Sequence, residues 1–148
     1  MRVEDLCFPI LFFTDWEKKP FIEVVRTYED LTTTTSYGVR KNVHCGAIIM
    51  DGYGNAARIK GATILKGVGR FSGFTIFFSR NVKVDLLIDE VSFFHISLDE
   101  LKEKVQACFN GWEGWEEAGN FEEMQAAIME AYSIEDVIKY IDKIGNRE

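Results

Sequence analysis

Ser97-Leu98-Asp99-Glu100 divides this chain of 148 residues into a first half with strand-like patterning and a second half with helical patterning. A serine followed three residues later by a glutamate is typical of a helix start, because the serine hydroxyl accepts a hydrogen bond from an unpaired amide and the glutamate reaches back. Apolar residues then recur at helical spacing at Leu98, Leu101, Val105, Cys108 and Phe109. The stretch therefore predicts where a sheet ends and helices begin.

The first half is predicted to be β-rich. The apolar run at 46–50 ends at Asp51-Gly52-Tyr53-Gly54-Asn55, a turn signal that predicts a hairpin into a strand at 56–65. Further strands are expected at 21–28, 71–79, 82–88 and about 91–96. Segment 29–41 stays open: its threonine run favours a strand, whereas Asp30 could cap a short helix. The simplest arrangement is an antiparallel meander of about four to five strands, built mainly from about 44 to 96.

Three helices are expected in the second half, near 98–109, 121–131 and 134–144, with Ser133 at the start of the third and Gly145 at its end. Strands followed by helices indicate an α+β fold with the helices packed on the sheet. We expect one domain over 1–148, β-rich over 1–96 and helical over 97–148. The expected helical core is Leu101, Val105, Ile128, Val137, Ile138 and Ile141, buried against sheet residues such as Ile76, Phe78 and Leu86.

Composition restricts the class of protein. Hydrophobic residues make up 47% of the chain and charged residues 28%, which is typical of a soluble domain with a core. The chain starts Met1-Arg2-Val3-Glu4-Asp5, with acids where a secretory signal carries bases, and no apolar run approaches a membrane span. The three cysteines are widely spaced without a Cys-x-x-Cys pair, which argues against a disulfide framework or a zinc site. We therefore expect a cytoplasmic protein without a metal or cofactor.

Charge is sorted along the chain. Residues 39–83 hold eight bases and one acid, whereas residues 84–148 hold 16 acids and five bases, within a net charge of −7. Such sorting bears on partners and association rates rather than on fold. It favours a binding protein over an enzyme.

The basic stretch supports one functional hypothesis. If the strand at 56–65 continues regularly, Arg58, Lys60 and Lys66 project to one face, with Arg70 and Arg80 at the ends of the next strand. Phenylalanines lie between those two arginines at positions 71, 74, 77 and 78. Bases with stacking aromatic rings suit single-stranded nucleic acid. The simpler interpretation is a phenylalanine core with a solvated basic face, and a pI near 4.9 also opposes a dedicated nucleic-acid binder.

The acidic stretch supports another hypothesis. Segment 111–120 joins two expected helices, is flanked by glycines and holds two of the three tryptophans. Tryptophan is enriched in interface hot spots, and neighbouring acids speed the encounter with a basic partner. The alternative is that both rings close the end of the helical core. The predicted partner-binding residues are Trp112, Glu113, Trp115, Glu116 and Glu117, with support from Glu122, Glu123 and Asp99.

Signals for catalysis are weak, and no catalytic residue is predicted. The glycine-rich segment 67–73 has the spacing GxGxxxG with no helix after it, so a turn between strands explains it better than a phosphate site. His44 adjoins Cys45, but neighbours in a strand point to opposite faces. His95 lies among apolar residues, where a packed histidine is commoner than a catalyst.

Several short motifs together resemble small bacterial immunity proteins of toxin–immunity pairs. The motifs span roughly 21–144: Leu31-Thr32-Thr33, Asp51-x-x-Gly54, Gly61-Ala62, Leu65-Lys66-Gly67-Val68-Gly69, Arg80-x-Val82-x-Val84 and Ser97-Leu98-Asp99-Glu100-Leu101-Lys102. They are turn glycines and core positions, so they bear on the fold, and no functional residue is carried over. The resemblance implies a small, acidic, cytoplasmic, non-catalytic protein that covers the active site of a toxin, often a basic nuclease.

Three functional hypotheses follow from the sequence. The first is a non-catalytic inhibitor, an immunity protein that neutralises a toxin domain in bacterial competition. The second is a nucleic-acid-binding sheet that uses residues 58–83. The third is a small enzyme or ligand-binding domain with His44, Cys45 or His95 in a pocket.

Overall fold

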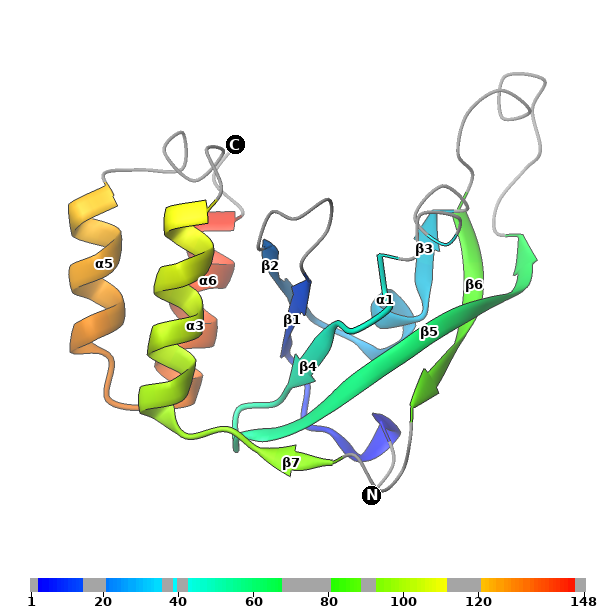
Figure 1. Cartoon of the computed structure of the whole chain (residues 1–148), viewed down its shortest axis with the longest axis horizontal. Coiled ribbons are helices and arrows are strands. Elements are labelled where there is room, and N and C mark those ends of the chain that lie inside the picture. The colour runs from blue at the N-terminus through cyan, green and yellow to red at the C-terminus, as the bar shows by residue number, and fades with distance from the viewer. Residues whose placement is uncertain are drawn as a thin grey trace.

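An antiparallel sheet with helices against one of its faces forms the architecture, as a computed structural model of the chain shows (Figure 1). The structure describes residues 3–14, 21–35, 39, 43–67, 81–88, 93–111 and 121–145. Within these ranges three C-terminal helices follow the strands: α3 Leu98–Gly111, α5 Phe121–Glu130 and α6 Ile134–Gly145. The predicted α+β class is confirmed.

The sheet contains more strands than predicted. Seven strands are described: β1 Ile10–Thr14, β2 Phe21–Val25, β3 Thr33–Thr35, β4 Ile48–Met50, β5 Asn55–Gly67, β6 Asn81–Ile88 and β7 Phe94–His95. Their order is β2-β1-β4-β5-β6-β3, with β7 paired to the start of β5. β4, β5 and β6 are consecutive antiparallel neighbours, and β5 pairs directly with β6, so the predicted order with a strand at 71–79 between them is wrong. The β1–β2 hairpin extends the sheet on one side and β3 on the other. The predicted strand at 71–79 lies outside the described residues.

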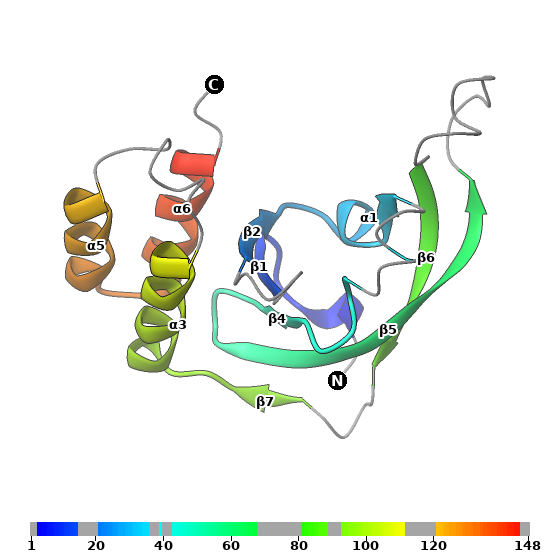
Figure 2. The same cartoon turned by 45° about the horizontal axis from the view of Figure 1, so that its top comes forward.

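Two bulges interrupt the ladder between β5 and β6. Ile59 pairs with Ile88, yet Gly61 pairs with the next residue along β6, Leu87. The register shifts again between Ile64 and Lys66, so Lys60 and Leu65 are extra residues on β5. Bulges increase local twist and bend the bulged strand. Figure 2 shows the result: β5 and β6 curve around the N-terminal 3₁₀ turn (Val3–Asp5) and the short helix α1 (Tyr28–Leu31).

In the described part of the open segment, helix α1 and strand β3 (residues 33–35) occur in succession, so both predicted alternatives are present. The N-cap of α1 is Thr27, whose hydroxyl oxygen accepts from the Asp30 backbone N–H at 3.1 Å. The prediction that Asp30 caps the helix is therefore wrong; Asp30 lies one turn inside it. The capping hydroxyl comes earlier because Thr27 has the extended backbone that an N-cap requires.

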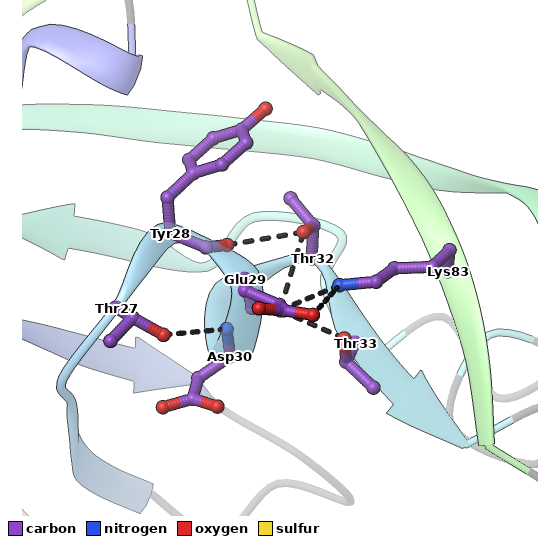
Figure 3. Close-up of polar contacts among 7 residues, drawn as sticks. All are labelled: Thr27, Tyr28, Glu29, Asp30, Thr32, Thr33 and Lys83. Carbon is purple, nitrogen blue, oxygen red and sulfur yellow. Dashed lines mark hydrogen bonds and ion pairs between the residues drawn. The ribbon is translucent and has the colours of Figure 1, made fainter. Parts of the chain in front are cut away.

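The side chain of Lys83, a residue of β6, connects that strand to α1 (Figure 3). Its ammonium donates to the Glu29 carbonyl oxygen at 3.3 Å and lies 3.6 Å from the Glu29 carboxylate. The same carbonyl accepts from the hydroxyls of Thr32 at 3.3 Å and Thr33 at 2.8 Å. The C-terminal end of α1 is thus tied to β3 and β6, which keeps the helix inside the curve.

Strand β1 is buried on both faces, and a separate core lies on each side of it. Ile10, Leu11, Phe12 and Phe13 are all buried. Leu11 and Phe13 face the helices, whereas Ile10 and Phe12 face the segment enclosed by the curve. The helix-side core includes Ile22, Met50, Ala56, Ile96, Leu101, Val105, Cys108, Met124, Ile128, Val137, Ile138, Ile141 and Ile144. The second core includes Leu6, Val25, Leu31, Ala47, Ile49, Ala57 and Ile59.

The predicted helical core is confirmed, because each of its six members is at most 2% exposed. The prediction that Leu86 lies under the helices is wrong: it is half-buried and packs against the second core, on the curved arm of the sheet. Ile76 and Phe78 lie outside the described residues. Within the described ranges, none of the helices has the length and apolar character that crossing a membrane demands.

Two helix starts agree with the sequence. The Ser97 hydroxyl oxygen accepts from the Glu100 backbone N–H at 3.3 Å, and the Ser133 hydroxyl oxygen accepts from the Asp136 backbone N–H at 3.1 Å. Each bond satisfies an amide that the first turn leaves unpaired. These caps fix the ends of α3 and α6 that meet at the candidate site.

Candidate functional site

One end of the molecule brings together the starts of α3 and α6, the end of α5 and the β4–β5 turn (Figure 1). Lys102 of α3 donates from its ammonium to the Met129 carbonyl oxygen of α5 at 2.9 Å. A Cβ placed on Gly52 of the turn would lie 3.1 Å from the Glu135 Cγ of α6. These contacts show that α3 and α5 are antiparallel and that the turn packs against α6.

The β4–β5 turn is held by the buried side chain of Asp51. One carboxylate oxygen accepts from the backbone N–H groups of Tyr53 at 2.9 Å and Asn55 at 3.0 Å. The other accepts from the Asn55 side-chain amide at 3.2 Å and from the Cys7 backbone N–H at 3.3 Å. Asp51 therefore fixes the turn and also attaches the N-terminal segment to it.

A cleft of about 310 Å³ lies between the N-terminal segment, this turn and α6. It is lined by Cys7, Phe8, Pro9, Gly52, Tyr53, Glu135, Ile138 and Lys139. Its volume is at the small end of the range for ligand pockets, which suits one side chain or a small ligand. Glu135 and Lys139 are exposed, and the side chain of neither makes a hydrogen bond or ion pair with a described residue.

Exposed apolar and aromatic side chains and exposed carboxylates also lie at this end of the molecule. Tyr132 is 93% exposed, Tyr53 65% and Met129 60%. We define the acidic end as these three residues together with Asp99, Glu100, Glu130, Glu135 and Asp136, all of them exposed. Lys102 and Lys139 lie at the same end, and the Lys102 ammonium already donates to the Met129 carbonyl oxygen. Large amphipathic side chains among unbalanced carboxylates suit contact with a basic protein surface.

The predicted partner site is only partly described. Trp112, Glu113, Trp115, Glu116 and Glu117 lie outside the described residues. Asp99, Glu122 and Glu123 are exposed, as an interface requires.

The structure does not bring these three acids together. Asp99 begins α3, whereas Glu122 and Glu123 begin the antiparallel α5, so the length of a helix, roughly 15–20 Å, separates them. Only Asp99 belongs to the acidic end. Tyr53, Tyr132 and Glu135 were not predicted as site residues: Tyr53 was assigned only to a turn, Glu135 lies in the first turn of the predicted third helix, and no motif marked Tyr132.

The predicted basic face is curved rather than flat. Arg58 and Lys60 are exposed on either side of the buried Ile59, and Lys66 lies beyond both bulges. The expectation of a regular strand is wrong, because the bulges bend β5. The Arg58 guanidinium also donates to the Gly46 carbonyl oxygen at 3.1 Å. Arg70 and Arg80 lie outside the described residues.

The two histidines have different surroundings. His44 is 5% exposed, its ring meets Phe12 edge-on with centroids 5.9 Å apart, and its Nδ1 has no hydrogen-bond partner among the described residues. Burial lowers the pKa of the His44 imidazole. His95 is exposed, with Nε2 3.1 Å from the Tyr53 carbonyl oxygen, so its expected packing among apolar residues is wrong. In the part of the chain that the structure describes, no three His, Cys, Asp or Glu side chains come close enough to hold a metal ion.

No family model matches this chain, and comparisons with curated proteins and with solved structures also find no significant match. A functional conclusion therefore rests on the geometry of the acidic end and its cleft.

His44 should make stability depend on pH. The unfolded chain takes up a proton at the ordinary histidine pKa of about 6.5, whereas the folded protein takes it up only at lower pH. The free energy of unfolding is therefore unaffected by His44 above about pH 6.5, the pKa of the unfolded chain. It falls as the pH drops below that value, by at most ~1.4 kcal/mol per pH unit. Denaturant unfolding should be measured from about pH 7.5 to about pH 5, a range that spans the ordinary histidine pKa. The free energy of unfolding should show this slope in the wild type and a smaller slope in His44→Phe.

The exposed His95 provides the control for that measurement. His95→Gln removes the other of the chain's two histidines, so the comparison shows whether the slope depends on His44. An unchanged slope in a folded His44→Phe variant would show that burial of this imidazole is not the cause.

Proposed function

We propose that this protein is a non-catalytic inhibitory binding protein, most concretely an immunity protein that neutralises a bacterial toxin domain by covering its active site. The observation that carries the proposal is the acidic end, where exposed rings and carboxylates border a cleft on a scaffold of two capped helices and a fixed turn. Such an inhibitor acts where the toxin would act, in the cytoplasm of the protected cell.

Each component of the acidic end has a role in this proposal. Tyr53 and Tyr132 offer large contact areas at low cost in side-chain entropy, as interface anchors do. The carboxylates attract a basic surface and raise the association rate. A toxin that cleaves nucleic acid presents such a surface, because it must itself attract phosphates. The inhibitor would therefore compete for the groups that bind the substrate.

The rigidity of the acidic end supports a preorganised interface. Asp51 accepts four hydrogen bonds within the turn and from Cys7, and Lys102 joins α3 to α5. A surface that is already ordered loses less conformational freedom on binding. Tight inhibition then needs only a few good anchors rather than a large area.

The proposal predicts that the neighbouring reading frame encodes a toxin domain, and co-expression with that domain tests it. The wild-type protein should protect the cells and form a stable complex with the purified domain. Tyr53→Ala and Tyr132→Ala should each weaken binding by ~30-fold or more, mainly through faster dissociation, if these rings are hot spots. Binding kinetics on folded variants gives the answer.

Tyr28→Ala supplies the matched control, since Tyr28 is also an exposed tyrosine (42%) but lies on α1, away from the acidic end. It should bind as the wild type does. Failure of the wild type to protect would contradict the proposed function. Protection that survives both tyrosine substitutions but is lost in Trp112→Ala or Trp115→Ala would instead place the interface where the sequence predicted it.

A further inference from the structure

We infer that the cleft of the acidic end receives an arginine side chain of the toxin partner. The inference rests on the proposed function for the identity of the partner, but its chemistry can be tested without that partner. It requires three properties of the cleft: walls that can contact a flat cation, a carboxylate free to pair with it, and a negative local charge.

The residues that line the cleft have the composition to hold a guanidinium group. Phe8 and Tyr53 contribute aromatic rings, and Ile138 contributes an aliphatic side chain. Guanidinium groups stack on aromatic faces, and the methylene stem of arginine packs on apolar surface. At about 310 Å³ the cleft has room for one such side chain.

Glu135 supplies the free carboxylate. It lines the cleft from the first turn of α6 and makes no hydrogen bond or ion pair with the described residues. A carboxylate can accept two parallel hydrogen bonds from arginine, which an ammonium group cannot donate in that geometry. This favours arginine over lysine as the occupant.

The charge around the cleft is negative despite Lys139. The start of α6 contributes about half a positive charge, and Lys139 contributes one more. Against them stand Glu135, Asp136 in the same turn, and Asp51, whose oxygen lies 3.3 Å from the Cys7 backbone nitrogen. Three carboxylates outweigh these positive charges, so a cation is the favoured occupant.

Titration of the isotope-labelled full-length protein with N-acetyl-arginine amide, followed by NMR, tests the inference. We expect binding with a Kd of ~1–10 mM, the range for a single side chain free in solution. The largest shift changes should fall on the amides of Cys7, Gly52, Tyr53 and Glu135. N-acetyl-citrulline amide has the same shape without the charge, and it should bind at least ~5-fold more weakly because it cannot form the ion pair.

Variants of the cleft sharpen the test. Glu135→Gln should bind the arginine and citrulline probes equally, whereas Lys139→Met should bind the arginine probe several-fold more tightly. Glu103→Gln changes an exposed carboxylate of α3 that does not line the cleft, and it should behave as the wild type does. All three positions are exposed, so the variants should fold, which the NMR spectrum itself verifies.

Equal binding of both probes to the wild type would overturn the inference, and so would shift changes scattered over other carboxylates. An unchanged preference for arginine in Glu135→Gln would also overturn it. These outcomes are separate from the proposed function. If the protein neutralises the toxin but does not bind the arginine probe, only the arginine cleft is refuted. If the protein binds the probe but does not neutralise the toxin, the proposed function is refuted and the cleft remains a cation-binding site.

Discussion

Leu11→Ala is expected to lower the free energy of unfolding by about 2–5 kcal/mol. Leu11 is fully buried in β1, between β2 and β4, and its side chain lies in the helix-side core. Truncation removes three carbons from this core and leaves a cavity that the ordered strands on both sides cannot close. Denaturant unfolding measures the loss.

Leu65→Ala makes the same chemical change on the same sheet. Leu65 is 66% exposed at the second bulge of β5, so its truncation should cost less than about 0.5 kcal/mol. Equal losses in the two variants would mean that the helices do not pack on β1. That result would contradict the two-core arrangement.

Gly54→Ala is expected to cost about 2–5 kcal/mol for two independent reasons. Gly54 has φ +87°, a backbone conformation that costs an L-residue about 1–2 kcal/mol. A Cβ there would also lie 2.6 Å from the Ile96 carbonyl oxygen and 2.7 Å from the His95 Nε2. The oxygen belongs to the backbone and cannot rotate away, so the turn or the start of α3 must shift.

Gly46→Ala separates these two reasons. Gly46 has a similar φ of +81°, but a Cβ there would meet no described residue within 4 Å. Its substitution should therefore show the conformational cost alone, about 1–2 kcal/mol. If Gly54→Ala lowers the free energy of unfolding no more than Gly46→Ala does, that result would contradict the close approach of the turn to Ile96. The same comparison tests the geometry of the cleft, because this turn forms one of its walls.

The sequence predicted the helical half well because its signals are local. Ser97 and Ser133 cap helices through bonds within four residues, and the apolar stripe of α6 repeats at helical spacing. The turn at Asp51–Asn55 was likewise predicted, since its hydrogen bonds are mostly internal. Local patterns of this kind do not depend on the rest of the fold.

Strand β1 was missed because it breaks the rule of alternation. Ile10-Leu11-Phe12-Phe13 is buried on both faces, so it has no polar residues at every second position. A short apolar run of this kind cannot be assigned from periodicity alone. The position of Leu86 was wrong for a related reason, because the bulges that turn β5 and β6 away from the helices leave no mark in the hydrophobic pattern.

The position of the candidate site could not be predicted from the sequence. Of the predicted partner-binding residues that the structure describes, only Asp99 belongs to the acidic end. Its position depends on contacts between distant segments: Cys7 with Asp51, Gly52 with Glu135, and Lys102 with Met129. Such contacts arise from tertiary packing, which charge patterning along a chain does not reveal.

The three free cysteines provide the most direct test of the central claim, that a partner covers the acidic end. Cys7 is exposed and lines the cleft, Cys45 is exposed and does not line it, and Cys108 is buried in the helical core. Burial raises the pKa of the Cys108 thiol to about 11, so this thiol should react poorly in every state. Alkylation rates at the three sites, measured by mass spectrometry with and without saturating toxin domain, compare all of them in one sample.

We predict that the partner protects Cys7 almost completely and leaves the rate at Cys45 unchanged. Protection of Cys45 with an unchanged rate at Cys7 would contradict the account, because the partner would then bind away from the acidic end.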